Sequence, residues 1–356
     1  MPDDRISLRQ LLTLTFAALL SPAIQLLPGL TAQRAGAAGW LATLAALPVL
    51  LGLCWLLWRL FGDGLPNAAQ RLLGSALGRV FCLLYFLWGL YLLAANARQV
   101  ALRFLTISYR NAPMVLFLLA LLGVTFWLVR KPVRALARAG EVFFLTLAAG
   151  LALSLLLGAF QVDTANLLPV WVEDLPAVGW ATLPVLGLLG YVVFAPCLGG
   201  HVVPEEGSRR KILRWAVGLC LTLTALQVVC LGNFGPGLAG RMDTPFFMMV
   251  KGIGFEGTFQ RMESVIIALW VLADLALLSL LACACSELAQ KGFAIKKRTT
   301  AVLPIILAAA AGAIWLFPDA FALDWALGGP VLWGSILFGL GGPLLLFVIS
   351  LFRKRE

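Results

Sequence analysis

The chain has 356 residues, of which 61% are hydrophobic and only 12% are charged, a composition that excludes a water-soluble globular protein of this size. Its formal charge of +10 is no sign of nucleic-acid binding, because the basic residues lie in short segments between apolar runs. These runs of roughly 17 to 25 residues can each cross a bilayer core of about 30 Å, so we expect an all-α polytopic membrane protein in which residues 1–356 form one membrane domain.

The hydropathy pattern predicts ten transmembrane helices and two terminal segments on the same side of the membrane. Acidic residues near the N-terminus and the lack of a small-residue cleavage site favour an uncleaved first span over a signal peptide. The predicted spans are about 10–33, 37–60, 77–106, 112–129, 140–160, 178–200, 211–235, 262–288, 299–317 and 328–351.

The distribution of Lys and Arg predicts that both termini are cytoplasmic. One side of the membrane collects most of the 27 basic residues: Arg5, Arg9, Arg59, Arg71, Arg79, Arg130, Lys131, Arg134, Arg138, Arg209, Arg210, Lys211, Arg214, Lys291, Lys296, Lys297, Arg298, Arg353, Lys354 and Arg355. The other side keeps only Arg34, Arg103, Arg110, Arg241, Lys251 and Arg261, and Arg98 alone lies inside a span.

The first span is interrupted near its middle by "SPAIQ", residues Ser21, Pro22, Ala23, Ile24 and Gln25. Proline removes a backbone donor, and non-helical backbone at this depth is tolerated only where it faces protein or a water-filled cavity. The sixth span has a matching interruption, because "LPVLGLLGYVVFAPCLGGHVVP" carries Gly187, Gly190, Pro196, Gly199 and Gly200. Paired breaks are typical of transporters with two inverted five-span repeats, here about 10–160 and 178–351. Simple proline kinks for packing remain an alternative.

Arg98 in the third span and Asp274 in the eighth are the ionisable residues deepest in apolar sequence. Buried charges in a membrane are costly and are usually paired, and helix rise places these two about 10 and 15 Å below the outer surface. We therefore predict an Arg98–Asp274 ion pair near a cavity, against the alternative that each is a structural clamp. Asn96 and Gln99 are weaker candidates for the same cavity.

The remaining functional residue types give weaker signals. Tyr191 and Phe194 at the sixth-span break are candidates for an apolar pocket or for ordinary packing, and His201 for proton coupling or an interfacial position. The cysteines lie mostly in apolar stretches and are predicted to be buried or lipid-facing: Cys54, Cys82, Cys197, Cys220, Cys230, Cys283 and Cys285. With no metal-ligand spacing or nucleotide-binding loop, we expect neither an enzyme nor a cofactor.

Several stretches resemble the spore germination permease family, the B subunits of nutrient germinant receptors, which are related to amino acid–polyamine–organocation transporters. In chain order they are "RISLRQLLTL", "LPGLTAQRAGAAGWL", "ARQVALRFL", "NAPMVLF" and "DTPFFMMVKGIGFEGTFQRMESVIIALWVL". The resemblance covers essentially the whole chain. It is strongest from Thr244 through Arg261 and Glu263 to Trp270.

The resemblance implies a LeuT-like 5+5 inverted repeat with broken helices 1 and 6 and a small-molecule site, usually for an amino acid, between spans one, three, six and eight. It also implies assembly with an A-type membrane subunit and a C-type lipoprotein subunit in the inner membrane of a spore. The positions that match the family are Arg98, Pro113, Pro245, Arg261 and Trp270.

Three positions depart from the family pattern. Ser21-Pro22 replaces a small pair at the first break, and neither Ala38 nor Val192 supplies the acidic residue common at its position. A missing carboxylate weakens recognition of a ligand ammonium, so a less polar nutrient or a different amino acid fits as well.

We therefore predict a nutrient sensor whose ligand shifts a two-state equilibrium. An amino-acid or ion-coupled secondary transporter and an assembly scaffold with a degenerate cavity remain alternatives. The expected ligand-binding residues are Ser21, Pro22, Ala23, Ile24, Gln25, Asn96, Arg98, Gly190, Tyr191, Val192, Phe194 and Asp274.

Overall fold

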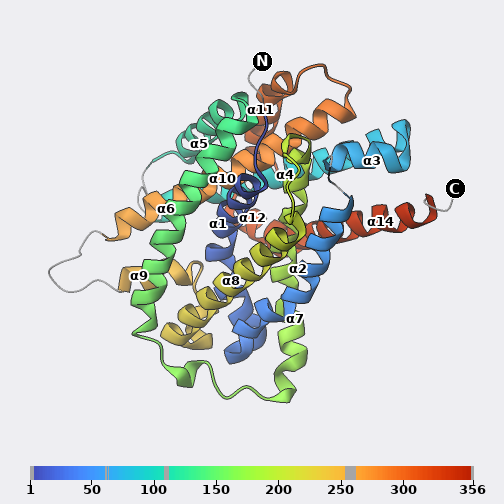
Figure 1. The fold of residues 1–356 in the computed structure, drawn as a ribbon. Helices are drawn as coiled ribbons and strands as arrows, with labels where there is room; N and C mark the ends of the chain where they lie inside the picture. Colours follow the sequence, from blue (N-terminus) through green and yellow to red (C-terminus); the bar gives the residue numbers. More distant parts are fainter. Residues whose placement is uncertain (1–3, 61, 63, 108–111, 253–261, 354–356) are drawn as a thin grey trace.

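The computed structural model describes residues 4–60, 62, 64–107, 112–252 and 262–353, and the regular elements of this part of the chain are helices (Figure 1). In chain order they are α1 (Leu8–Ala35), η1 (Gly36–Trp40), α2 (Leu41–Leu60), α3 (Leu65–Leu73), α4 (Ser75–Ile107), α5 (Met114–Arg130), α6 (Val133–Ala159), η2 (Thr164–Asn166), η3 (Val172–Asp174), α7 (Leu175–Leu189), η4 (Gly190–His201), α8 (Ser208–Ala239), α9 (Pro245–Gly252), α10 (Met262–Gly292), α11 (Arg298–Trp315), α12 (Ala320–Ala326), η5 (Leu327–Val331), α13 (Leu332–Ile336), η6 (Leu337–Gly341) and α14 (Gly342–Arg353).

Each predicted span falls on one long helix or one continuous helical run, which confirms an all-helical polytopic membrane protein. By length and composition, eight helical stretches of the described residues can cross a membrane. One of these, Leu8–Leu60, has 53 residues and contains both α1 and α2, and the apolar α5 has 17 residues and is not among the eight. The count of ten therefore stays a prediction.

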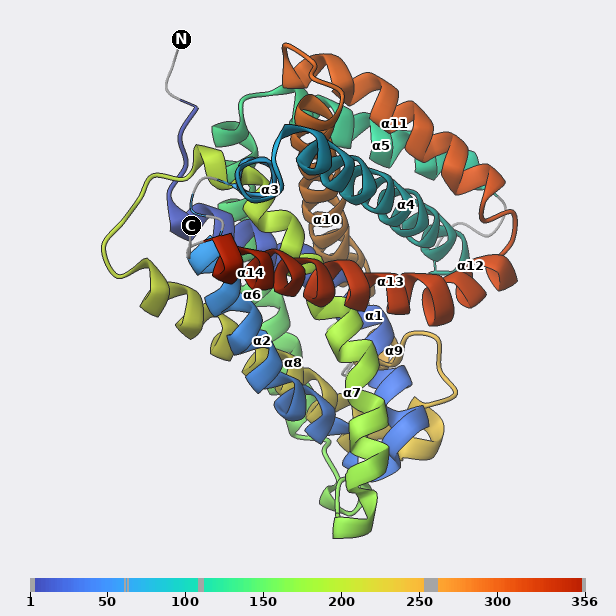
Figure 2. The same ribbon diagram turned by 90° about the vertical axis from the view of Figure 1, so that its right-hand side faces the viewer.

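The long helices form two groups that meet along α1 and α10. In one group α1, α2, α7 and α8 pack against one another, and in the other α4, α5, α10 and α11 do so. Figure 2 shows the second group at the upper right and α12 to α14 crossing in front of both groups. Because α1 also packs against α6 and α10, this helix lies at the junction of the groups.

The outer surface of the helices is strongly apolar. Trp127 on α5, Leu145 on α6 and Trp315 on α11 are exposed, as are many other large hydrophobic side chains. Soluble monomers rarely expose continuous apolar surface of this extent, whereas a bilayer solvates it. The protein is therefore a multi-pass membrane protein.

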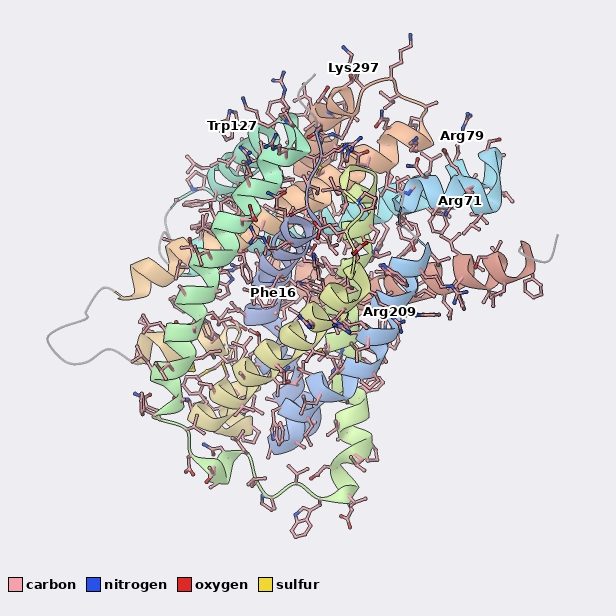
Figure 3. All side chains as sticks on the ribbon, in the orientation of Figure 1. Phe16, Arg71, Arg79, Trp127, Arg209 and Lys297 are labelled. Atoms are coloured by element: carbon pink, nitrogen blue, oxygen red, sulfur yellow. The ribbon has the colours of Figure 1, made fainter. Side chains whose placement is uncertain are left out.

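Basic side chains gather at one end of the helices. Arg71, Arg79 and Lys297 lie at the end where the N-terminus also lies, uppermost in Figure 3. We call this the basic end. Arg103, which the sequence pattern placed in an outer segment, is instead buried within the fold. Arg110 and Arg261 lie outside the described residues, and so does the side chain of Glu263.

The sixth span is interrupted as predicted, but the first is not. At Gly190 the regular α-helix α7 gives way to η4, a 3₁₀ stretch of 12 residues, a length that is uncommon and that often marks a functional hinge. In contrast, α1 is one continuous helix with Pro22 and Pro28 inside it, so the predicted break at Ser21–Gln25 is wrong. Proline removes one hydrogen bond, and a helix surrounded by other helices tolerates that loss without unwinding.

The predicted burial of the cysteines is confirmed. All seven are buried and none forms a disulfide. They act as small apolar residues of the core.

Hydrogen bonds around His201 connect the N-terminal segment, η4 and α10 near the basic end. We call this group of contacts the latch. The His201 ring, at the end of η4, lies 3.0 Å from the Glu287 carboxylate on α10 and 3.1 Å from the Asp4 carbonyl oxygen. Beside it, Ile6 N–H donates to the His201 carbonyl and Val203 N–H donates to the Ile6 carbonyl, both at 2.9 Å. The latch therefore ties the N-terminal segment, η4 and α10 together.

Replacing His201 with phenylalanine is expected to destabilise the fold by about 1–3 kcal/mol, the cost of removing a hydrogen bond from the largely buried Glu287 carboxylate, which keeps Arg298 at 3.4 Å as an ion-pair partner. Thermal unfolding of the purified protein in detergent measures the loss. His201→Gln is the control, because its amide can still donate to Glu287. Equal stability of His201→Phe and the parent protein would contradict the structural role of the latch.

Candidate functional site

A buried polar network joins α1, α4 and α10 in the middle of the fold. The Arg103 guanidinium donates to both carboxylate oxygens of Asp274, at 3.0 and 3.2 Å, and also to the Gln25 side-chain oxygen. The Ser21 hydroxyl donates to the same carboxylate. Asp274 is 1% exposed and Arg103 is 8% exposed, so this ion pair lies in a low-dielectric interior.

An aromatic ring fixes the guanidinium from one side. The Arg103 guanidinium carbon lies 4.3 Å from the centre of the Trp270 ring, within the range of a cation–π contact. Trp270 lies one helical turn from Asp274 on α10, so one face of this helix supplies both the carboxylate and the ring. The Asp274 carboxylate, the Gln25 amide oxygen and the Trp270 ring together stabilise a cation that apolar surroundings alone would not hold.

The predicted Arg98–Asp274 pair is wrong, because Arg103 takes the place of Arg98. Arg98 donates instead to the Pro318 carbonyl at 2.7 Å and lies 3.3 Å from the Met114 sulfur. Five residues separate the two arginines, and five steps of about 100° turn the helix by roughly 140° beyond one full turn. The two side chains therefore point to different neighbours.

A small cavity of about 60 Å³ lies between α1, α4, α7, η4 and η5. Pro22, Asn96, Gln99, Gly187 and Tyr191 are among its lining residues. The Asn96 amide donates to the Tyr191 hydroxyl at 3.1 Å, so one hydrogen bond crosses from α4 to η4 beside the cavity. The ion pair itself lies within the second group, and the hydrogen bonds of Ser21 and Gln25 connect it to α1 in the first group.

The structure brings some of the predicted ligand-binding residues together and separates others. Ser21, Gln25 and Asp274 belong to the polar network, and Pro22, Asn96 and Tyr191 line the small cavity. Ala23 is buried. Ile24 lines another cavity, of about 30 Å³, beside Trp270. The remaining four lie elsewhere: Arg98, Gly190, Val192 and Phe194.

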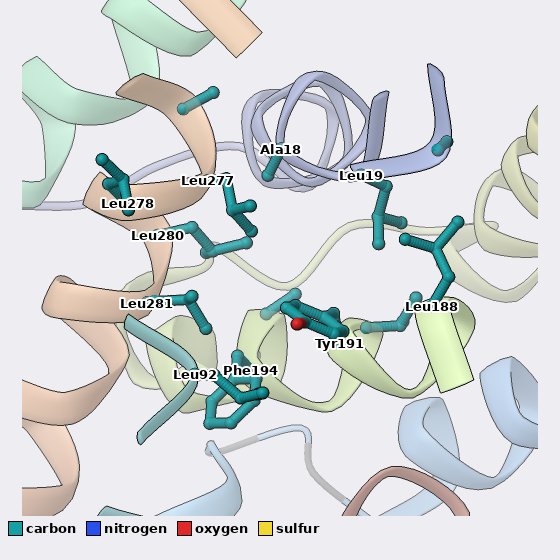
Figure 4. Close-up of a cluster of buried hydrophobic side chains, with 14 of the residues drawn as sticks. Ala18, Leu19, Leu92, Leu188, Tyr191, Phe194, Leu277, Leu278, Leu280 and Leu281 are labelled. Carbon is teal, nitrogen blue, oxygen red and sulfur yellow. The ribbon is translucent and has the colours of Figure 1, made fainter. Parts of the chain in front are cut away.

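Phe194 and Gly190 serve packing in this structure. Figure 4 shows Phe194 and Tyr191 within a cluster of leucine side chains that includes Leu188 and Leu281. A side chain on Gly190 would collide with the backbone carbonyl of Ser335, so Gly190 allows two segments to approach closely. Val192 lines a different and larger cavity near the basic end.

Sequence reasoning missed Arg103, which the structure places at the centre of the network. The chain carries a signal for it, because Arg103 lies on the same predicted span as Arg98, in the apolar run "ALRFL", whereas Arg79 lies at the opposite end of that span. Counting it among outer basic residues removed it from consideration.

Comparison with known proteins gives a consistent result. The family described as spore germination protein matches residues 5–319 of this chain. Spore germination protein KB of Bacillus subtilis (strain 168) is 26% identical over 277 residues, which cover 74% of this chain and 72% of that protein.

Solved structures share the fold. A Na⁺-coupled sialic acid symporter, in a substrate-bound outward-open state, aligns with a TM-score of 0.63 at 12% identity, over 94% of this chain and 79% of that one. MhsT in complex with L-phenylalanine aligns with a TM-score of 0.63 at 14% identity, over 98% of both chains. These neighbours have the LeuT fold, which confirms the LeuT-like fold expected from the sequence, whereas the count of ten helices stays a prediction.

Proposed function

Because the chain belongs to the spore germination protein family, we propose that it is a membrane subunit of a spore germinant receptor, which binds a small nutrient in a transporter-like cavity and triggers germination. The nutrient proposed is an amino acid. The proposed partners of the protein are an A-type membrane subunit and a C-type lipoprotein in the spore inner membrane. In the proposed orientation the basic end and both termini face the cytoplasm, and residues 10–160 and 178–351 form inverted repeats.

The observation that carries this proposal is the small cavity between the two helix groups, with the Asn96–Tyr191 hydrogen bond beside it. Its volume of about 60 Å³ is far below the roughly 300–1,000 Å³ of ordinary small-molecule sites. A nutrient can enter only if the groups move apart, so binding favours a more open state. That displacement is what partner subunits would read.

Leu26→Trp is expected to raise the amino-acid concentration needed for germination about tenfold or more, because Leu26 lines the cavity and overpacking costs about 1–3 kcal/mol. The measurement is germination of spores over a panel of amino acids, with the protein quantified by immunoblot. Leu119→Trp, on the exposed face of α5, is the matched control.

Unchanged dose responses at normal protein levels would overturn the sensor proposal. Uptake of radiolabelled amino acid into vesicles would then favour the alternative of a secondary transporter, which the fold shared with a Na⁺-coupled symporter supports. Absence of both germination effects and uptake would favour a scaffold.

A further inference from the structure

A second and much larger cavity lies between the start of α1 and the end of α2, away from the polar network. Its volume is about 450 Å³. Its walls come from the first turns of α1, the last turns of α2, the η4 segment and the first turns of α8. These segments all lie where their spans end, so the cavity sits at the level where membrane lipids change from acyl chain to headgroup.

The walls of this cavity are mainly apolar. Leu11, Leu57, Val192, Ile212 and Trp215 contribute to them. The Trp215 indole N–H donates to the Leu12 carbonyl at 2.9 Å, which fixes the ring between α8 and α1. The site therefore offers a preformed apolar volume within the size range of small-molecule sites.

The cavity opens to the surface of the molecule. Trp58, at the end of α2, is 42% exposed and lines it, and Val203 lines it and is also exposed. Tryptophan is enriched where a membrane meets water, because one part of its ring is apolar and the other donates a hydrogen bond. A lipid molecule can therefore reach the cavity from the side.

The charge at the mouth is positive. Glu205 lines the mouth, but it accepts a hydrogen bond from Lys211, which neutralises its charge and holds the pKa of this carboxyl below its usual value. Arg209 also lines the mouth, is exposed and has no ion-pair partner among the described residues. Figure 3 shows Arg209 beside the chain segments that form the cavity.

We propose that this cavity binds an acyl chain of an anionic phospholipid, with the lipid phosphate at Arg209. An apolar volume with a single uncompensated cation at its mouth matches a lipid with an apolar tail and an anionic head. An amino acid matches it poorly, because the walls offer few partners for its ammonium group. This site does not depend on the nutrient site.

The lipid site also explains why position 192 holds a valine and not an acidic residue. An acidic residue at this position would place a carboxylate in the apolar wall of the cavity, where burial of an unpaired charge is costly. Valine instead continues the wall. Because Val192 directly follows Tyr191, which lines the small cavity, one segment of η4 contributes to both sites.

The test is native mass spectrometry of the purified full-length protein, titrated in detergent with dioleoyl phosphatidylglycerol or dioleoyl phosphatidylcholine. We expect one tightly retained phosphatidylglycerol per chain and weaker retention of phosphatidylcholine. Arg209→Gln should weaken phosphatidylglycerol binding about fivefold, the effect of one basic residue near an anionic surface. Arg210→Gln, which changes the neighbouring exposed arginine, should leave it unchanged because Arg210 does not line the cavity.

A second pair of variants tests the apolar volume. Ile212→Trp fills the cavity and should reduce retention further, whereas Leu221→Trp, on an exposed position of the same helix, should not. Thermal unfolding establishes that each variant is folded. Equal retention of the two lipids, or equal effects within either pair of variants, would overturn the proposal, and so would retention of amino acid in place of lipid.

Discussion

Replacing Arg103 with methionine is expected to destabilise the protein by about 3–5 kcal/mol, the largest single effect outside packing defects. Methionine has a similar length but cannot neutralise Asp274, which is 1% exposed and would be left as a buried, unpaired carboxylate. Thermal unfolding of the purified protein in detergent measures the loss. The amount of folded protein in the membrane should fall with it.

A double-mutant cycle separates the ion pair from general packing. Because the cost comes mainly from the orphaned charge, adding Asp274→Leu to Arg103→Met should restore much of the lost stability. The matched control is Arg98→Met, since Arg98 donates to the Pro318 carbonyl and leaves no carboxylate behind. Rescue by Asp274→Leu in the Arg98→Met background, and not in the Arg103→Met background, would show that the pairing described here is incorrect.

The network has a consequence for function because it joins the two helix groups. Ser21 and Gln25 belong to α1, whereas Arg103 and Asp274 belong to α4 and α10. Two further polar contacts involve η4: the Asn96–Tyr191 bond joins it to α4, and the His201–Glu287 bond joins it to α10. In the proposed sensor, a nutrient that separates the groups would stretch some of these polar contacts and preserve others, and in this way a local event would shift a two-state equilibrium.

Much of the fold could be predicted from the sequence because a membrane span has a length and a hydropathy that leave few alternatives. The broken sixth span was also readable, since glycines at 187, 190, 199 and 200 and Pro196 leave no room for a regular helix. The proline in the first span was misleading. The backbone N–H that Pro22 lacks weakens α1, but packing against the surrounding helices decides whether α1 unwinds there.

Side-chain partners were harder to predict than spans. Arg98 and Arg103 lie on one helix, about 7.5 Å apart along its axis, and the rotation of α4 about this axis helps to decide which of them reaches Asp274. Rotation depends on packing against several neighbours at once, and an apolar helix that is buried on most sides carries little periodicity to reveal it. For this reason Asp274 was correctly predicted to form an ion pair, but with Arg98 in place of Arg103.

Replacing Gly190 with tryptophan is expected to abolish accumulation of folded protein rather than to fill a ligand cavity. A Cβ atom at Gly190 would overlap the Ser335 backbone, and a Cβ atom at Gly339 would overlap the Gly190 backbone. Backbone atoms cannot rotate away as a side chain can, so even Gly190→Ala should cost about 1–3 kcal/mol or more. Immunoblots of membrane fractions and gel filtration of detergent extracts measure the folded amount.

Gly179 provides the matched control, because it lies on α7 and a side chain there meets nothing within 4 Å. Gly179→Trp should accumulate normally, and normal accumulation of Gly190→Trp would contradict the close approach of η4 and η6. Loss of germination in a Gly190→Trp spore therefore reports lost packing and says nothing about the nutrient. Since Leu26 lines the cavity and is only partly buried, a nutrient effect has to be sought there, where the amount of protein and the response can change independently.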